Sequence, residues 1–142
     1  MAFEHLLPLA TSIFLAAAAP GTTLDLPISN ARNTKGVFHI CVTAAERQFP
    51  DCSKDPAAIK RTVAATTRSV RIGGIPAGRY AVTLFHDENN NQRLDTMLGI
   101  PREGFGFSRN PAVRFGAPKF RQVEFQLVPG NNSQPIHLQY LL

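Results

Sequence analysis

The stretch Arg79–His86 (RYAVTLFH) decides the fold class of this chain. It follows the turn-forming run Gly73–Gly78 (GGIPAG), which separates it from whatever precedes it. Successive side chains of a strand point to opposite faces, and apolar residues occupy both sets of alternating positions here. The two sets are Tyr80, Val82 and Leu84, and Ala81, Thr83 and Phe85. The pattern predicts a central strand that is covered on both faces.

Strand patterns lie on both sides of this stretch. Leu24, Leu26 and Ile28 alternate with less apolar neighbours, as in a half-buried strand. The other predicted strands are Gly36–Thr43, one or two within Arg61–Ile72, Arg121–Val128 and Pro135–Leu142. About seven strands joined by turns predict an all-β fold, an antiparallel β-sandwich of immunoglobulin-like or transthyretin-like type.

Two segments show little strand pattern. Ala44–Arg61 is predicted to be a loop with a helical turn near Pro56–Arg61. Asp87–Phe120 is longer, and loops of this length in compact domains are usually functional or disordered. Its glycines and phenylalanines favour an ordered loop that packs on the sandwich.

The N-terminal segment is typical of a targeting signal. Leu6–Ala19 is apolar, carries no charge and ends in small residues, which predicts a signal peptide over residues 1–19 and one β-sandwich domain over residues 20–142. Met1–His5 has no Lys or Arg, which is atypical of a signal, so a buried or membrane-resting helix is the alternative. The run is too short to span a bilayer, and we expect no stable transmembrane anchor after cleavage. The expected location is the periplasm or the medium.

The two cysteines, Cys41 and Cys52, fit an exported protein with one disulfide, and two buried thiols are the alternative. The formal net charge is +5, but the basic residues are scattered and form no run. This argues against nucleic-acid binding, which favours a clustered basic stripe. The charge is compatible with an anionic lipid or polysaccharide surface without indicating one.

The segment that carries chemistry is His86–Asp95 (HDENNNQRLD). Its side-chain oxygens recur at a spacing typical of calcium loops, in which the seventh position contributes a backbone carbonyl. The predicted ligands are Asp87, Asn89, Asn91 and Asp95, the carbonyl of Arg93, and Glu103 from further along the chain. The twelfth position, which usually holds a bidentate glutamate, is Leu98. The alternative is an Asn-rich turn without metal.

Phe105 and Phe107 alternate with glycines in Gly99–Ser108. One interpretation is a loop folded onto the core by its own aromatic side chains. The other is an aromatic-lined cleft for an apolar or carbohydrate ligand, which requires that the rings be accessible.

These motifs resemble a bacterial family of small exported proteins, domain of unknown function twenty-one forty-one. The matching stretches are Gly78–Val82, His86–Asp95, Gly99–Ser108 with Asn110, and Phe115–Phe120. The resemblance implies an exported β-sandwich without an assigned activity, with a cation loop at Asp87, Asn89, Asn91, Asp95 and Glu103. The sequence departs from the family pattern at Asn90 and Gln92, where glycine is expected, and at Phe105, where tyrosine is expected. Gln92 in particular predicts weaker calcium binding, because glutamine adopts a left-handed conformation less readily than glycine.

Three functions are compatible with the sequence. The first is a non-enzymatic binding or structural module with a calcium-stabilised loop, whose partner is an unidentified ligand or cell-envelope component. The second is a carrier with a cleft near Phe105 and Phe107. The third is a hydrolase that uses His86, Asp87 and Glu103, although Ser108 lies in no nucleophile-elbow motif. Under the first hypothesis, loss of Asp87 or of Asp95 lowers the melting temperature only in calcium.

Overall fold

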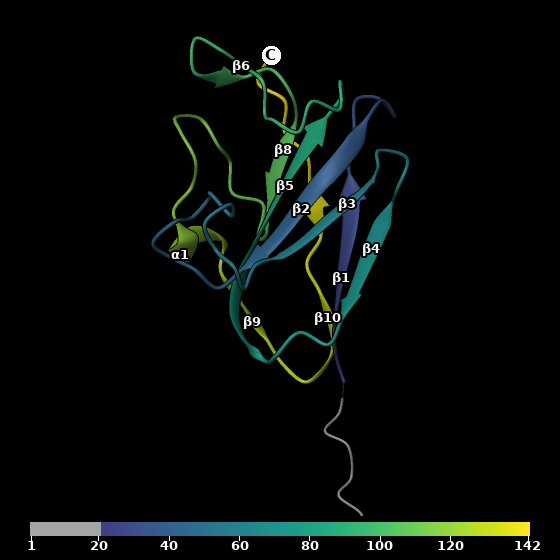
Figure 1. Ribbon diagram of the computed structural model, residues 1–142, viewed down its shortest axis with the longest axis vertical. Helices are drawn as coiled ribbons and strands as arrows, with labels where there is room; N and C mark the ends of the chain where they lie inside the picture. The colour runs from purple at the N-terminus through teal and green to yellow at the C-terminus, as the bar shows by residue number, and fades with distance from the viewer. Residues whose placement is uncertain (1–20) are drawn as a thin grey trace, which may run out of the picture.

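The structure, a computed structural model, describes residues 21–142, and the predicted signal peptide lies outside them. These residues form eleven strands and one four-residue helix (Figure 1). The elements are β1 (Thr22–Ser29), β2 (Val37–Thr43), β3 (Ile59–Ala64), β4 (Ser69–Gly73), β5 (Gly78–Asp87), β6 (Thr96–Met97), β7 (Ile100–Pro101), β8 (Phe105–Phe107), α1 (Phe120–Val123), β9 (Phe125–Leu127), β10 (Gly130–Ser133) and β11 (Ile136–His137). No helix within this part of the chain has the length and hydropathy that a bilayer crossing requires.

Two sheets form the predicted β-sandwich. In the larger sheet the strand order is β3–β2–β5–β8, with β9 also on β5, and every pairing is antiparallel. In the other sheet β1 pairs antiparallel with β4, and its second edge pairs in parallel with β10 and then β11. Gln139 exchanges two backbone hydrogen bonds with Phe105 of β8, so the C-terminal segment links the two sheets at one side.

The main core lies between the sheets. Alternate residues of β1, β2 and β5 point into it, and their side chains are almost fully buried. They are Leu24, Leu26 and Ile28, Phe38, Ile40 and Val42, and Val82 and Leu84. Burial of each such side chain stabilises the fold by roughly 1.5–3 kcal/mol relative to exposure.

A second apolar cluster covers the outer face of the larger sheet. It contains Ala81 of β5, Phe105 and Phe107 of β8, and Phe120 and Val123 of α1, with Phe85 packed against it. The predicted covering of β5 on both faces is therefore confirmed: residues 82 and 84 face the main core, and residues 81 and 85 face this cluster.

The predicted disulfide is present. Cys41 of β2 bonds to Cys52, with the Cα atoms 6.6 Å apart. The bridge holds the loop between β2 and β3 against the sheet. Closing a loop with a sequence separation of 11 corresponds to a stabilisation of about 3 kcal/mol in the chain-entropy picture.

The prediction of about seven strands was wrong, because very short strands and a single helical turn leave no alternating pattern of apolar residues in the sequence. Arg121–Val128 is not one strand: α1 buries Phe120 and Val123 before β9 begins at Phe125. Of the predicted helical turn near Pro56–Arg61, only a turn at Pro56 and Ala57 is present, closed by the Ala58 N–H to the Asp55 carbonyl, and β3 begins at Ile59. The segment after Asp87 contains β6, β7 and β8, and the stretch between Arg121–Val128 and Pro135–Leu142, where no strand is predicted, contains β10.

Candidate functional site

The loop over residues 87–95, called the acidic loop below, begins where the end of β5 lies against the start of β2. Gly36 makes this approach possible: a Cβ atom there would lie 1.9 Å from the carbonyl oxygen of Asp87. Its φ of 69° also falls in the left-handed region that glycine adopts at little cost. The close contact fixes the position from which the loop leaves the sheet.

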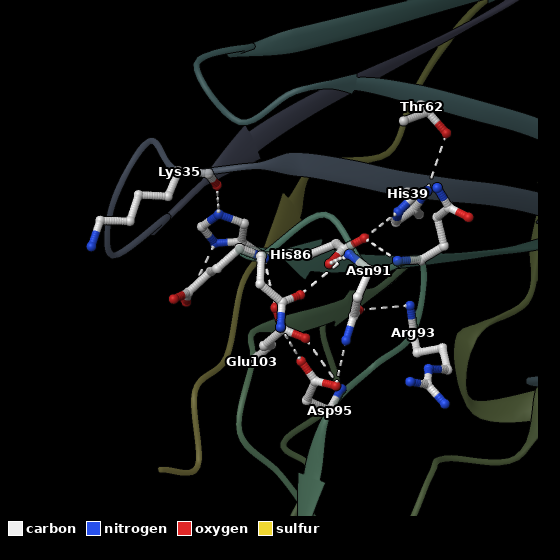
Figure 2. Close-up of polar contacts among 12 residues, drawn as sticks. Lys35, His39, Thr62, His86, Asn91, Arg93, Asp95 and Glu103 are labelled. Carbon is white, nitrogen blue, oxygen red and sulfur yellow. Dashed lines mark hydrogen bonds and ion pairs between the residues drawn. The ribbon is translucent and has the colours of Figure 1, made fainter.

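The Asp87 carboxylate is fully buried and anchors the loop. Two of the residues that bind it, His39 and Asn91, are labelled in Figure 2. Its Oδ1 accepts the N–H of Asn91 at 3.0 Å, and its Oδ2 accepts the N–H of Gln92 at 2.7 Å. Oδ2 also accepts Nε2–H of His39 at 2.8 Å, while Nδ1 of that ring lies 3.1 Å from the hydroxyl of Thr62. Burial raises the pKa of Asp87, but these hydrogen bonds outweigh it and leave the pKa below its usual value.

The loop turns through two left-handed residues, Asn90 with φ 53° and Gln92 with φ 66°. These are the two positions at which the resemblance described above leads us to expect glycine. Asparagine tolerates this conformation, and Gln92 is held in it by the hydrogen bond from its N–H to Asp87. Two left-handed residues other than glycine therefore cost the loop conformational energy.

The second half of the loop gathers around Asp95. Nδ2 of Asn89 donates to Oδ2 of Asp95 at 2.8 Å, and Nδ2 of Asn91 donates to Oδ1 at 2.7 Å. The amide hydrogen bonds from Asn91 and Asn89 lower the pKa of Asp95, which the Arg93 guanidinium and a hydrogen-bonding contact with the Glu103 carboxyl also favour. Arg93 itself joins the loop through its N–H, 3.0 Å from Oδ1 of Asn91.

Glu103 links the two ends of the loop. Its buried carboxylate accepts the N–H of Glu88 at 2.6 Å and the N–H of Asp95 at 3.1 Å. The segment between Asp95 and Glu103 is the hairpin β6–β7, which a further backbone bond from Arg102 N–H to the Asp95 carbonyl closes at its base. The structure thus places Asn89, Asn91 and Glu103 around Asp95. The Asp87 carboxylate lies apart from this group and binds the loop backbone and His39 instead.

The oxygen atoms of the loop supply part of the ligand set that a hard cation requires. Asp95 and Glu103 place two carboxyl-bearing residues side by side, with Oε1 of Glu103 3.1 Å from the backbone nitrogen of Asp95, and neighbouring carboxylates favour a bound cation. Within residues 21–142, however, no three His, Cys, Asp or Glu side chains lie close enough to hold a metal by themselves. Amide oxygens of Asn89 and Asn91 would have to complete the site, which requires that each amide turn its oxygen toward Asp95 in place of its nitrogen.

A polar cavity of about 510 Å³ lies beside the loop. Its lining includes Arg32, Glu88, Asp95, Arg102 and Glu103. Arg32 spans it: the guanidinium forms an ion pair of 2.6 Å with Glu88 and donates to the carbonyl oxygen of Arg102 at 2.9 Å. This side chain ties the loop to the segment between β7 and β8.

An apolar cleft of about 630 Å³ lies on the other side of the hairpin, and Thr96 lines both cavities. Its floor includes Phe85, Phe105 and Phe107 on the outer face of the larger sheet. The rings of Phe105 and Phe107 are only 5% and 7% exposed, because they pack in the second cluster while an edge of each borders the cleft. One wall is the hairpin, and the other is the segment Val113–Ala117.

The chain is similar to one known protein family over most of its length. A family model described as "uncharacterized protein conserved in bacteria (DUF2141)" matches residues 26–135. The chain belongs to this family. No curated protein and no solved structure matches it. The DUF2141 match includes the acidic loop, the hairpin and most of the cleft lining.

The histidine beside the loop of this DUF2141 chain has a structural environment. His86 is fully buried, and its Nε2 lies 2.7 Å from the carbonyl oxygen of Lys35. A carbonyl only accepts, so Nε2 carries the proton, and in the neutral ring Nδ1 accepts from the Tyr140 hydroxyl at 2.9 Å. The Tyr140 oxygen in turn accepts the N–H of Arg32 at 3.1 Å.

Three members of this DUF2141 site were not identified from the sequence. His39 lies in mid-strand and contacts Asp87 only because β2 pairs with β5. Arg32 lies 55 residues before Asp87 and Tyr140 lies 45 residues after Asp95. The Arg32 guanidinium stacks 4.7 Å from the Tyr140 ring centre. Only a histidine at an otherwise apolar strand position could have drawn attention to His39.

Proposed function

We propose that this DUF2141 protein is a non-enzymatic, exported binding module whose loop over residues 87–95 is held in shape by calcium. One observation carries the proposal: the Glu103 carboxylate lies beside Asp95 and accepts its backbone N–H at 3.1 Å, in a loop whose turn is already formed. A divalent cation between them would remove the repulsion of two neighbouring carboxylates. The Arg93 carbonyl and the two asparagine amides are the neutral oxygen donors that such a site uses.

The environment of the other titratable residues supports a binding role. Asp87 and Glu103 use their carboxylates to hold backbone N–H groups, and both ring nitrogens of His86 have partners inside the protein. The three residues of the hydrolase hypothesis are also buried. A general base must reach its substrate, and none of these side chains is free to do so in this geometry.

The disulfide supports export. Disulfides persist in oxidising compartments such as the periplasm and the extracellular medium. This agrees with the apolar N-terminal run that predicts a signal peptide.

Calcium in this loop would have a mechanical effect on the cleft. Asp95 and Glu103 flank the hairpin β6–β7, which forms one wall of the cleft. Joining the two carboxyl groups would fasten both ends of that hairpin at its base, and so fix the wall against the sheet.

The test is a thermal melt in chelator, in about 10 mM calcium and in magnesium. A site with a Kd of roughly 10⁻⁴–10⁻³ M raises the free energy of unfolding by about 1.4–2.7 kcal/mol at that concentration. Asp95→Asn should abolish the calcium-specific rise. Asp51→Asn is the control for loss of one aspartate carboxylate, because Asp51 accepts the N–H of Ser53 in the loop between β2 and β3, away from the predicted calcium ligands. Equal melting temperatures in calcium and chelator would refute the calcium site.

The cleft favours a second candidate function, a carrier of a small apolar ligand. A volume of about 630 Å³ with a mainly apolar lining is typical of small-molecule sites. Native mass spectrometry of protein purified without detergent should then show an additional bound mass. Its absence, together with no binding of an apolar fluorescent probe, would count against the carrier.

A further inference from the structure

Exposed apolar side chains gather at one end of the molecule. Seven large apolar residues among those described are exposed: Met97, Leu98, Ile100, Phe115, Val128, Leu141 and Leu142. All but Val128 belong to the hairpin, the Val113–Ala117 wall or the C-terminal residues, and Ile100 and Leu141 line the cleft directly. The hairpin and the C-terminus lie together at the top of Figure 1, whereas the β9–β10 connection that carries Val128 lies at the bottom. Scattered exposed apolar residues are normal, but a cluster of this kind marks an interaction surface.

Leu98 occupies the tip of the hairpin at an energetic cost. It is 96% exposed and has a φ of 52°, and Gly99 follows it with a φ of 78°. Two-residue hairpin turns of this type favour Asn, Asp or Gly at both central positions. Leucine here is disfavoured both by the backbone conformation and by water, so stability of the isolated protein does not explain it.

Phe115 is the counterpart on the opposite wall of the cleft. Its ring is 98% exposed, and Gly116 turns the chain immediately after it with a φ of 75°. The neighbouring Arg114 lines the cleft. Two nearly fully exposed apolar side chains therefore project from the two walls of one cleft.

The segment that includes both tips, residues 96–123, is mainly basic. Residues 96–123 contain five basic residues, all exposed, and one acid, Glu103, which is buried and hydrogen-bonded. The basic residues are Arg102, Arg109, Arg114, Lys119 and Arg121. Within residues 21–142, none of these five forms an ion pair. Their charge is available to an anionic partner.

We propose that this end of the molecule docks onto an anionic phospholipid membrane. Leu98 and Phe115 enter the boundary between headgroups and acyl chains, and the Arg102 and Arg114 guanidinium groups contact lipid phosphates. Apolar side chains that project from a basic surface are the combination that binds an interface of this kind. The proposal names the envelope component that the binding module would meet, and it does not depend on calcium in the loop.

The experiment measures flotation of the purified protein with vesicles of phosphatidylcholine alone and of phosphatidylcholine mixed with phosphatidylglycerol. We expect binding to the mixed vesicles that weakens as salt is raised. Leu98→Asn and Phe115→Ser should each reduce the partition coefficient about tenfold or more, since each removes one inserted apolar side chain. Leu98→Asn should not lower the melting temperature, because asparagine suits the left-handed turn. Val128→Ser, at the opposite end, should leave the partition coefficient unchanged.

Several results would overturn the proposal. One is equal binding to neutral and anionic vesicles, and another is a loss with Val128→Ser as large as that with Leu98→Asn. A third is a dimer in sedimentation that Leu98→Asn dissociates, without vesicle binding by the wild type, since the tips would then be a surface for a second copy. Flotation is run both in calcium and in chelator. A calcium-specific melt without flotation removes the membrane proposal alone, and flotation without a calcium-specific melt removes the calcium loop alone.

Discussion

Replacing Asp87 by asparagine tests whether this carboxylate anchors the loop independently of any cation. Three donors converge on its two oxygens: the N–H groups of Asn91 and Gln92, and Nε2–H of His39. Asparagine offers one acceptor oxygen and an amide that donates. With that oxygen at Oδ1, the Gln92 N–H faces another donor, whereas His39 can recover a bond by changing its tautomer.

The magnitude follows from these contacts. A hydrogen bond to a charged group contributes about 1.5–3 kcal/mol, and an unsatisfied buried donor costs about 1–3 kcal/mol. We therefore expect Asp87→Asn to reduce the free energy of unfolding by about 2–4 kcal/mol. For a domain of this size the melting temperature should fall by roughly 6–15 °C. Asp95→Asn should cost less than about 1 kcal/mol in chelator, because its partners are side-chain amides near the surface that water can satisfy.

Urea unfolding followed by circular dichroism, in chelator and in calcium, measures both changes. The structure revises the expectation that loss of either aspartate matters only in calcium. Replacement of Asp87 should destabilise the protein in both conditions, whereas replacement of Asp95 should do so substantially only when calcium is present. A loss below about 1 kcal/mol for Asp87→Asn in chelator would refute the anchoring role, since the hydrogen bonds it makes could not then be net stabilising.

Two further predictions concern the surroundings of the loop. Gly36→Ala should lower the free energy of unfolding in urea by about 3–5 kcal/mol, because the new Cβ collides with the Asp87 carbonyl and the backbone is left-handed. Gly73→Ala is the control and should be nearly neutral, because no atom lies within 4 Å of the new Cβ. Equal effects of the two substitutions would contradict the argument. Burial raises the pKa of Tyr140, so its contribution to stability is complete below the pKa of an unfolded tyrosine and is lost as pH rises through the folded pKa. Between about pH 8 and 11, the free energy of unfolding should therefore fall more steeply for the wild type than for Tyr140→Phe. Parallel curves would show that Tyr140 carries no such linkage.

The strands that run through the core were predictable, because burial on one or both faces leaves a two-residue period in the sequence. Thr22–Ser29 and the central strand Gly78–Asp87 follow that period. Val123 and Phe125 follow it too, but Val123 is buried by a helical turn, and spacing over so few residues does not distinguish the two conformations.

Part of the site was also predictable. The spacing of Asp87, Asn89, Asn91 and Asp95 is local, and a tight turn brings such side chains together whatever the rest of the fold does. His39 joins them through strand pairing, which the sequence alone does not specify. The exposure of individual side chains was the least predictable property. Leu98 and Phe105 are both apolar, yet Leu98 projects into water and Phe105 is buried.

The parallel pairing of β1 with β10 and β11 has a consequence for the order of events in folding. The chain is synthesised from its N-terminus, and the second edge of β1 is complete only when residues 130–137 are available. Until then a strand that carries Leu24, Leu26 and Ile28 has its apolar side chains in place and one open edge. Pairing between the two ends of the domain is slow to form, because the whole intervening chain must be ordered first. The first strand to emerge is thus the last to be closed, and this interval is when the chain is most open to capture by a chaperone or by another copy of itself.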